Sequence, residues 1–130
     1  MYLSVIIPAY NEERNIEKTV KSVFGYLKTR NIEHEIIVVT DGSTDKTAYI
    51  VRLLKTELST LELVEFEKNR GKGFAVKTGM LKARGDFRLF TDADNATTIN
   101  HIERMTPYFK EGYGVVIASI AVKGHNIAVG

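Results

Sequence analysis

The chain has 130 residues, of which 44% are apolar and 26% are charged, and this composition predicts one globular domain spanning residues 1–130. Its formal net charge of +2 gives no reason to expect nucleic acid as a partner. The sequence contains no cysteine, which excludes disulfides, a thiolate nucleophile and cysteine-ligated metal sites. It has neither a signal-peptide pattern nor an apolar run of about 18 residues, so we expect a cytoplasmic protein without a transmembrane segment in this chain.

The first half of the chain begins with a strand, a helix and a second strand. Residues 3–7 form a nearly continuous apolar run that ends at Pro8, which is typical of a buried strand. Residues 11–30 then show apolar side chains at helical spacing, with Asn11 as a suitable N-cap. Residues 35–40 form a second apolar run and therefore predict a second buried strand.

The alternation of strands and helices continues along the rest of the chain. After the second strand, Ser43, Thr44 or Asp45 can cap the next helix. Further strands are predicted at 61–66, 87–91 and 115–122, and further helices at 74–84 and 99–109. Because parallel strands need crossovers and crossovers are usually helical, this order predicts an α/β fold of three layers, a mostly parallel sheet with helices on both faces.

Polar and acidic residues follow several of the predicted strands. They occupy residues 8–12, 41–43 and 92–95. In open α/β sheets, ligands bind beyond the carboxyl ends of the strands, where the strand order reverses. We therefore expect these three segments to meet at one edge of the sheet and to form the functional site.

The Asp92-Ala93-Asp94 segment is a candidate metal site. Two carboxylates one residue apart can reach the same hard cation, and oxygen ligands of this kind suit Mg²⁺ or Mn²⁺ shared with substrate phosphates. The same residue types are also common in solvated loops and helix caps, so the pair by itself leaves both interpretations open. Its place after a predicted strand favours the metal site.

Three further residues near this edge are candidates for binding a nucleotide. Asp41 follows a buried strand, where its carboxylate can accept hydrogen bonds from a base or a ribose, although Asp-Gly is also a common turn. Glu12 can serve the site or act as a favourable charge in the first turn of a helix. Tyr10 can stack on a base or pack against the protein.

Residues 69–73, Asn-Arg-Gly-Lys-Gly, combine glycines and cations before a predicted helix, and these features favour anions. The spacing is not that of a P-loop, and no Gly-x-Gly-x-x-Gly follows the first strand. Seven of the eighteen basic residues lie between residues 68 and 88. We expect most of them on a solvated helix face, with Arg70 and Lys72 placed to bind a diphosphate.

Five segments in order resemble the signature of family 2 glycosyltransferases of the GT-A fold. They are residues 5–13, 38–47, 69–75, 83–86 and 92–94. Within that family the segments are most similar to those of dolichyl-phosphate or polyprenyl-phosphate glucosyltransferases. The resemblance covers about residues 3 to 105 and implies a Rossmann-like nucleotide-binding half.

The resemblance implies an enzyme that transfers a hexose, with glucose favoured, from a nucleoside-diphosphate sugar to a polyprenyl or dolichyl phosphate with inversion. It implies a UDP-sugar, or alternatively a GDP-sugar, and Mg²⁺ or Mn²⁺ on the catalytic pair Asp92 and Asp94. The base and ribose pocket it implies consists of Pro8, Ala9, Tyr10, Glu12 and Asp41. A saccharide acceptor and a non-catalytic nucleotide-binding module are the alternatives.

Two departures from the family pattern change these expectations. Thr40 stands where the family usually shows an acid, which removes one expected base or ribose contact. Family members also continue well beyond residue 130, so we expect this chain to be the nucleotide-binding part, truncated at its C-terminus and inactive alone. Without that part, the apolar surface around residues 115–120 is uncovered, which predicts a homo-oligomer. The lipid acceptor predicts association with the cytoplasmic face of a membrane.

Overall fold

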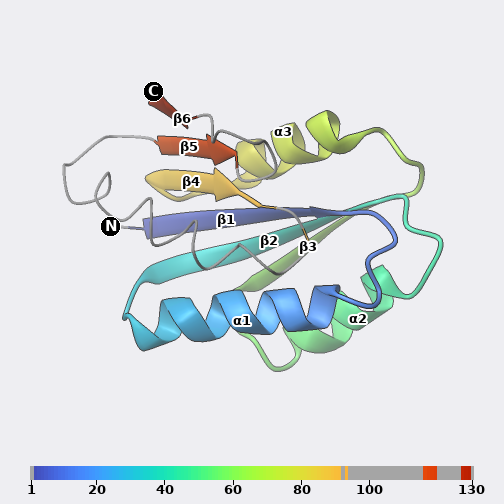
Figure 1. Cartoon of the computed structure of the whole chain (residues 1–130), viewed down its shortest axis with the longest axis horizontal. Coiled ribbons are helices and arrows are strands. Elements are labelled where there is room, and N and C mark those ends of the chain that lie inside the picture. Colours follow the sequence, from blue (N-terminus) through green and yellow to red (C-terminus); the bar gives the residue numbers. More distant parts are fainter. Residues whose placement is uncertain (1, 92, 94–115, 120–126, 130) are drawn as a thin grey trace.

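The computed structural model describes residues 2–91, 93, 116–119 and 127–129, and its centre is a single sheet (Figure 1). The strand order is β3-β2-β1-β4-β5-β6. The strands are β1 (Tyr2–Ala9), β2 (Glu33–Asp41), β3 (Leu61–Phe66), β4 (Phe87–Phe90), β5 (Val116–Ser119) and β6 (Ile127–Val129). The helices are α1 (Ile16–Thr29), α2 (Thr47–Lys55) and α3 (Lys72–Lys82).

The sheet separates two helical layers, as the alternating sequence predicts. Helices α1 and α2 cover one face, and α3 covers the other (Figure 1). The buried strands are apolar on both sides, so Val5 and Ile7 pack toward α1 whereas Ile6 packs toward α3. The predicted α/β architecture with helices on both faces is therefore confirmed.

The site edge of the sheet is set by the pairing of β1. This strand pairs in parallel with β2 on one side and with β4 on the other, so the strand order reverses at β1. The register places Ala9 opposite Thr40, and both strands end at the same edge. Because β3 is parallel to β2 and β5 is parallel to β4, the carboxyl ends of all five strands lie at that edge. Only β6 is antiparallel among the described strands, and the sequence did not predict it.

The predicted strands at 3–7, 35–40, 61–66 and 87–91 are confirmed, but two predicted helix starts are wrong. Helix α1 begins at Ile16, and Asn11 lies outside it with a positive φ of 51° instead of capping it. Helix α3 begins at Lys72 instead of Phe74. The reason for the first difference is that the Asn11 side chain bonds to a distant loop, which local helix signals do not reveal.

Several expectations concern residues that the structure does not describe. The predicted helix at 99–109 lies outside the described residues, and β5 covers only part of the predicted strand at 115–122. The apolar surface expected around residues 115–120, and the homo-oligomer that depends on it, stay predictions. Among the described helices, none combines the length and apolar character that a bilayer crossing requires.

A buried carboxylate ties the amino ends of β1 and β2 to the segment before β4. Glu35 is 3% exposed, and its Oε2 accepts hydrogen bonds from Ser4 Oγ and Arg84 N, each at 2.6 Å. Ser4 Oγ in turn accepts a bond from Gly85 N at 2.9 Å. The 83–86 segment therefore lies at the edge opposite the predicted site, where its backbone satisfies buried polar groups and fixes the entry into β4.

We expect Glu35→Ala to lower the free energy of unfolding by about 2–3 kcal/mol, because it leaves buried donors of Ser4 and Arg84 without an acceptor. Urea denaturation followed by circular dichroism measures the change. Glu33→Ala on the same strand is the matched control, since Glu33 is exposed and its loss should cost less than about 0.5 kcal/mol. Equal stability of the two variants would show that the network contributes nothing.

Candidate functional site

A cleft of about 510 Å³ opens at the carboxyl ends of the central strands. It brings together six of the substrate-binding residues that the sequence predicts: Pro8, Ala9, Tyr10, Glu12, Asp41 and Lys72. Among the residues that the structure describes, Asn69, Gly71 and Ala93 also line it. The cleft therefore draws on segments that follow β1, β2, β3 and β4, as expected for a ligand site at the reversal of strand order.

The carboxylate of Asp41 holds the loop that precedes α3. Asp41 is 4% exposed; its Oδ1 accepts a hydrogen bond from Arg70 N at 2.7 Å, and its Oδ2 accepts one from Gly71 N at 3.0 Å. Sequence reasoning missed this role, because the partners lie about 30 residues away and donate through their backbones. Each carboxylate oxygen has a further lone pair, so the group can also accept a bond from a ligand in the cleft.

The turn after Asp41 lies directly against the same loop. Gly42 has a φ of +71°, and a Cβ at this position would come within 2.3 Å of Asn69 N. The Asn69 side chain accepts a hydrogen bond from Gly71 N at 3.1 Å. Glycine is therefore required at position 42 both by the backbone conformation and by the approach of Asn69. The chain therefore turns at Asp41-Gly42 as expected, while the binding of a base or ribose by Asp41 stays a prediction.

The loops after β1 and β2 bind each other through reciprocal hydrogen bonds. Asn11 Oδ1 accepts a bond from Thr44 N at 2.8 Å, while Asn11 N donates to Ser43 Oγ at 3.0 Å. Glu12 N donates to Thr47 Oγ1 at 2.8 Å. These bonds fix the loop that carries Tyr10 and Glu12 at the cleft. Asn11, Ser43 and Thr44 are residue types that often cap helices, but here they form tertiary hydrogen bonds between the two loops.

Asp45 is the acidic member of this loop pair. Burial is the largest single influence and raises the pKa of its carboxyl, but the hydrogen bonds from the Thr47 hydroxyl, Thr47 N and Glu13 N together outweigh it, so the pKa lies below its ordinary value. The ionised form therefore stabilises the fold at neutral pH, and this contribution is lost as the pH falls through the lowered pKa. Of the three proposed caps for α2, Asp45 alone bonds to a backbone N–H of the helix, that of Thr47.

Glu12 lies at the cleft and not in a helix. Helix α1 begins four residues later, and the Glu12 carbonyl accepts hydrogen bonds from Asn15 N at 3.0 Å and Ile16 N at 2.8 Å. The alternative interpretation of Glu12 as a first-turn helix charge is therefore wrong. Its backbone instead shapes the entry into α1.

The two cations predicted to bind a diphosphate point to different places. Lys72 lines the cleft, at the first residue of α3. Arg70 lines a neighbouring hollow of about 560 Å³ with Phe66 and Phe74, and its guanidinium lies 5.5 Å from the Phe74 ring centre. In this structure Arg70 reaches the site through its backbone N–H to Asp41, so a diphosphate contact by its side chain stays a prediction.

The acidic pair Asp92 and Asp94 lies outside the described residues, but Ala93 between them is described. Ala93 is buried, lines the cleft and accepts a 2.6 Å hydrogen bond from Thr19 Oγ1 through its carbonyl. This bond fixes the backbone between the two acids to α1. In the part of the chain that the structure describes, no group of three His, Cys, Asp or Glu side chains is arranged to hold a metal ion.

Comparison with known proteins identifies relatives of the chain. Residues 4–128 match the sequence model of glycosyl transferase family 2. The chain is 42% identical over 105 residues to the dolichyl-phosphate beta-glucosyltransferase ALG5D of Trichomonas vaginalis, covering 77% of this chain and 32% of that protein. It is 37% identical over 111 residues to the dolichyl-phosphate beta-glucosyltransferase of Saccharomyces cerevisiae, covering 81% and 33%. The chain thus spans about one third of the length of these relatives.

Solved structures share the fold. The mannosyltransferase PcManGT from Pyrobaculum calidifontis, solved with GDP-Man and Mn²⁺, has a TM-score of 0.67 and 32% identity, covering 79% of this chain and 32% of that one. S. aureus TarS 1-349 in complex with UDP-GlcNAc has a TM-score of 0.65 and 33% identity, covering 83% and 32%. These likenesses confirm the GT-A architecture that the sequence resemblance implied.

We expect Gly42→Ala to destabilise the protein by about 1–3 kcal/mol, because alanine disfavours the positive φ and its Cβ meets the Asn69 backbone. Thermal denaturation measures the stability, and hydrogen exchange should show faster opening of the Arg70 and Gly71 amides. Gly25→Ala in α1 is the matched control, since its Cβ meets no atom within 4 Å and alanine favours helix by about 1 kcal/mol. A loss of stability in Gly25→Ala as large as in Gly42→Ala would contradict the steric explanation.

Proposed function

Because the chain belongs to glycosyl transferase family 2, we propose that its cleft binds a nucleoside-diphosphate sugar as the donor half of an inverting glycosyltransferase. The observation that carries the proposal is the cleft at the reversal of strand order, where a carboxylate suited to a base and a cation suited to a phosphate line one cavity. Asp41 and Lys72 supply these two groups.

The nucleotide contacts follow from the chemistry of the lining. Asp41 accepts from a ring N–H, which uracil and guanine carry and unmodified adenine and cytosine lack at the equivalent position. Tyr10 is 49% exposed and offers a ring on which the base stacks. Lys72 and the amino end of α3 attract the diphosphate, since helix N-termini favour anions. Pro8, Ala9 and Glu12 complete the base and ribose pocket.

A divalent cation, Mg²⁺ or Mn²⁺, belongs to the same proposal. Asp92 and Asp94 are oxygen donors that suit such an ion, and the residue between them lies at the cleft. The Pyrobaculum relative was solved with GDP-Man and Mn²⁺, which supports a metal beside the diphosphate. When bound, the ion stabilises negative charge on the leaving diphosphate.

The acceptor that fits the names of the two dolichyl-phosphate beta-glucosyltransferases is a polyprenyl or dolichyl phosphate, and the donor sugar is glucose. A phosphate oxygen of the acceptor attacks the anomeric carbon while the bond to the nucleoside diphosphate breaks on the opposite side. By analogy with phosphorylated side chains, the acceptor phosphate has a second pKa near 6, so it is already an anion at neutral pH. The chain therefore needs no general base for this acceptor. Because the acceptor is a lipid, we place the reaction at the cytoplasmic face of a membrane.

Nucleotide binding tests the donor site directly. We expect UDP or GDP to bind more tightly than ADP, and UDP affinity to fall at least about tenfold in chelator and in Asp94→Ala, which is about 1.4 kcal/mol. Isothermal titration with Mn²⁺ and with EDTA measures both effects. Asp86→Ala is the matched control, because Asp86 is exposed before β4 at the opposite edge. Unchanged affinity in chelator and in Asp94→Ala would remove the metal role, and preference for ADP would remove the base contact of Asp41.

Transfer itself requires the acceptor phosphate about 3 to 3.5 Å from the anomeric carbon, held by groups that close over the donor. We expect hexose transfer to polyprenyl phosphate from a version of the chain extended to the length of its relatives, and none from residues 1–130. Radiolabelled UDP-glucose, polyprenyl phosphate and a saccharide acceptor distinguish the acceptor classes. Transfer to the saccharide alone would refute the lipid acceptor. Nucleotide binding without transfer by the extended chain would support a non-catalytic module. Robust transfer by residues 1–130 would refute the interpretation that these residues supply only the donor half of the enzyme.

A further inference from the structure

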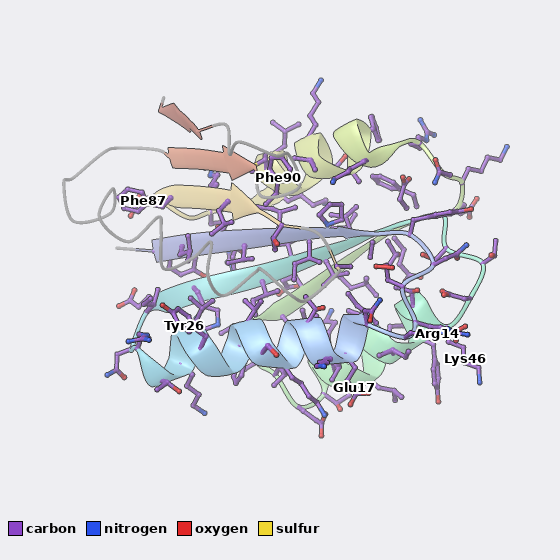
Figure 2. All side chains as sticks on the ribbon, in the orientation of Figure 1. Arg14, Glu17, Tyr26, Lys46, Phe87 and Phe90 are labelled. Carbon is purple, nitrogen blue, oxygen red and sulfur yellow. The ribbon has the colours of Figure 1, made fainter. Side chains whose placement is uncertain are left out.

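Helix α1 places one polar side chain on its buried side. Thr19 is 0% exposed, and the other buried residues of the helix are isoleucine, valine and leucine. Glu17, two residues earlier, is exposed on the outer side of the same helix (Figure 2). Because two residues turn an α-helix through about 200°, Thr19 lies on the side that packs on the sheet.

The hydroxyl of Thr19 does not use the hydrogen bond that a helix itself offers to threonine. In a helix, this hydroxyl can donate to the carbonyl three or four residues earlier. Thr78 of α3 bonds in this way, with its Oγ1 donating to Phe74 O at 2.9 Å. Thr19 Oγ1 instead donates to Ala93 O at 2.6 Å, a residue 74 positions away. The hydroxyl therefore ties α1 to the segment that follows β4.

Ala93 is held both by packing and by this bond. Its side chain is 3% exposed and belongs to the apolar core beneath α1. Two residues earlier, Thr91 N donates to Ile6 O at 2.9 Å, so the backbone is bonded to β1 as far as that residue. The bond from Thr19 continues this support beyond the end of β4 to Ala93, which lines the cleft.

We propose that Thr19 is a positioning residue for Asp92 and Asp94, the acids on either side of Ala93, and that it thereby sets the affinity of the cleft for a divalent cation. This role rests on the proposed function, which gives the acids an ion to hold. Consecutive Cα atoms are about 3.8 Å apart, so an anchored Ala93 restricts both neighbours through covalent geometry alone. The anchored carbonyl also belongs to the planar peptide unit that leads to Asp94.

An anchored backbone strengthens ion binding through preorganisation. Groups that are ordered before binding lose less conformational entropy when they bind. Partners that orient metal ligands without touching the metal typically change its affinity by about 10–100-fold. Thr19 is buried and is not among the described residues that line the cleft, so it acts through Ala93 and makes no direct contact with a ligand there.

Binding of UDP at different Mn²⁺ concentrations tests this role. Isothermal titration compares the full chain with Thr19→Val and Thr19→Ser, both in a Mn²⁺ series and in EDTA. We expect Thr19→Val, which removes the donor and keeps the shape, to lower the Mn²⁺ affinity measured with UDP at least about tenfold. Its UDP affinity in EDTA should equal that of the parent, because the base pocket does not depend on the bond. Thr19→Ser keeps the hydroxyl and should restore the Mn²⁺ affinity.

The matched control is Thr78→Val, which removes a threonine hydroxyl bond from a partly exposed position of α3. It should leave the Mn²⁺ affinity unchanged. Circular dichroism and thermal denaturation establish that each variant is folded. If Thr19→Val does not fold, Thr19→Ala takes its place with the same expected result, since alanine also lacks the donor and favours the helix.

A folded Thr19→Val with the Mn²⁺ affinity of the parent would overturn the positioning role and leave the proposed donor site intact. An equal loss of UDP affinity in Mn²⁺ and in EDTA, or no recovery in Thr19→Ser, would show a purely structural role. UDP binding by the parent that does not respond to Mn²⁺ would contradict both the positioning role and the proposed metal. The two kinds of failure are therefore distinguishable.

Discussion

The two hydrogen bonds accepted by the buried Asp41 carboxylate hold the functional edge of this protein together. They join the end of β2 to the loop that begins α3, and Gly42 allows that loop to approach within van der Waals contact. One wall of the cleft and the first residue of α3 both depend on this junction. A charged group that is almost fully buried is stable here because both oxygens have backbone donors.

The strands β1 to β4 were predictable because their signal is local. A buried parallel strand is a continuous apolar run, and β1, β2 and β3 each show one or part of one. The same reasoning gathered the strand ends at one edge, and the structure places Tyr10, Asp41 and Lys72 around one cleft there. The chemistry of these residue types indicated which ligands they could bind. The parallel topology predicted that they would lie close together.

The helix starts and the internal roles of polar residues were not predictable from local patterns. Asn11 has the side chain of a good N-cap, but its partner is Thr44, 33 residues away. Asp41 resembled a ligand group and also proved to hold a loop, while Arg70 resembled a phosphate contact and stacks on Phe74. Each of these polar side chains can bond to several groups of similar chemistry. The tertiary fold determines which of these groups lies within hydrogen-bonding or stacking distance.

The two ends of the sheet use the polar residues of one family signature in different ways. At the amino end, the buried Glu35 accepts hydrogen bonds from Ser4 and Arg84, and these bonds join β1, β2 and the segment before β4. At the carboxyl end, the bonds between the loops leave Tyr10 and Lys72 facing an open cleft. Buried polar groups that satisfy one another make the scaffold rigid, and a rigid scaffold holds the exposed side chains at the opposite end in fixed positions around the cleft, which is what the proposed donor site requires.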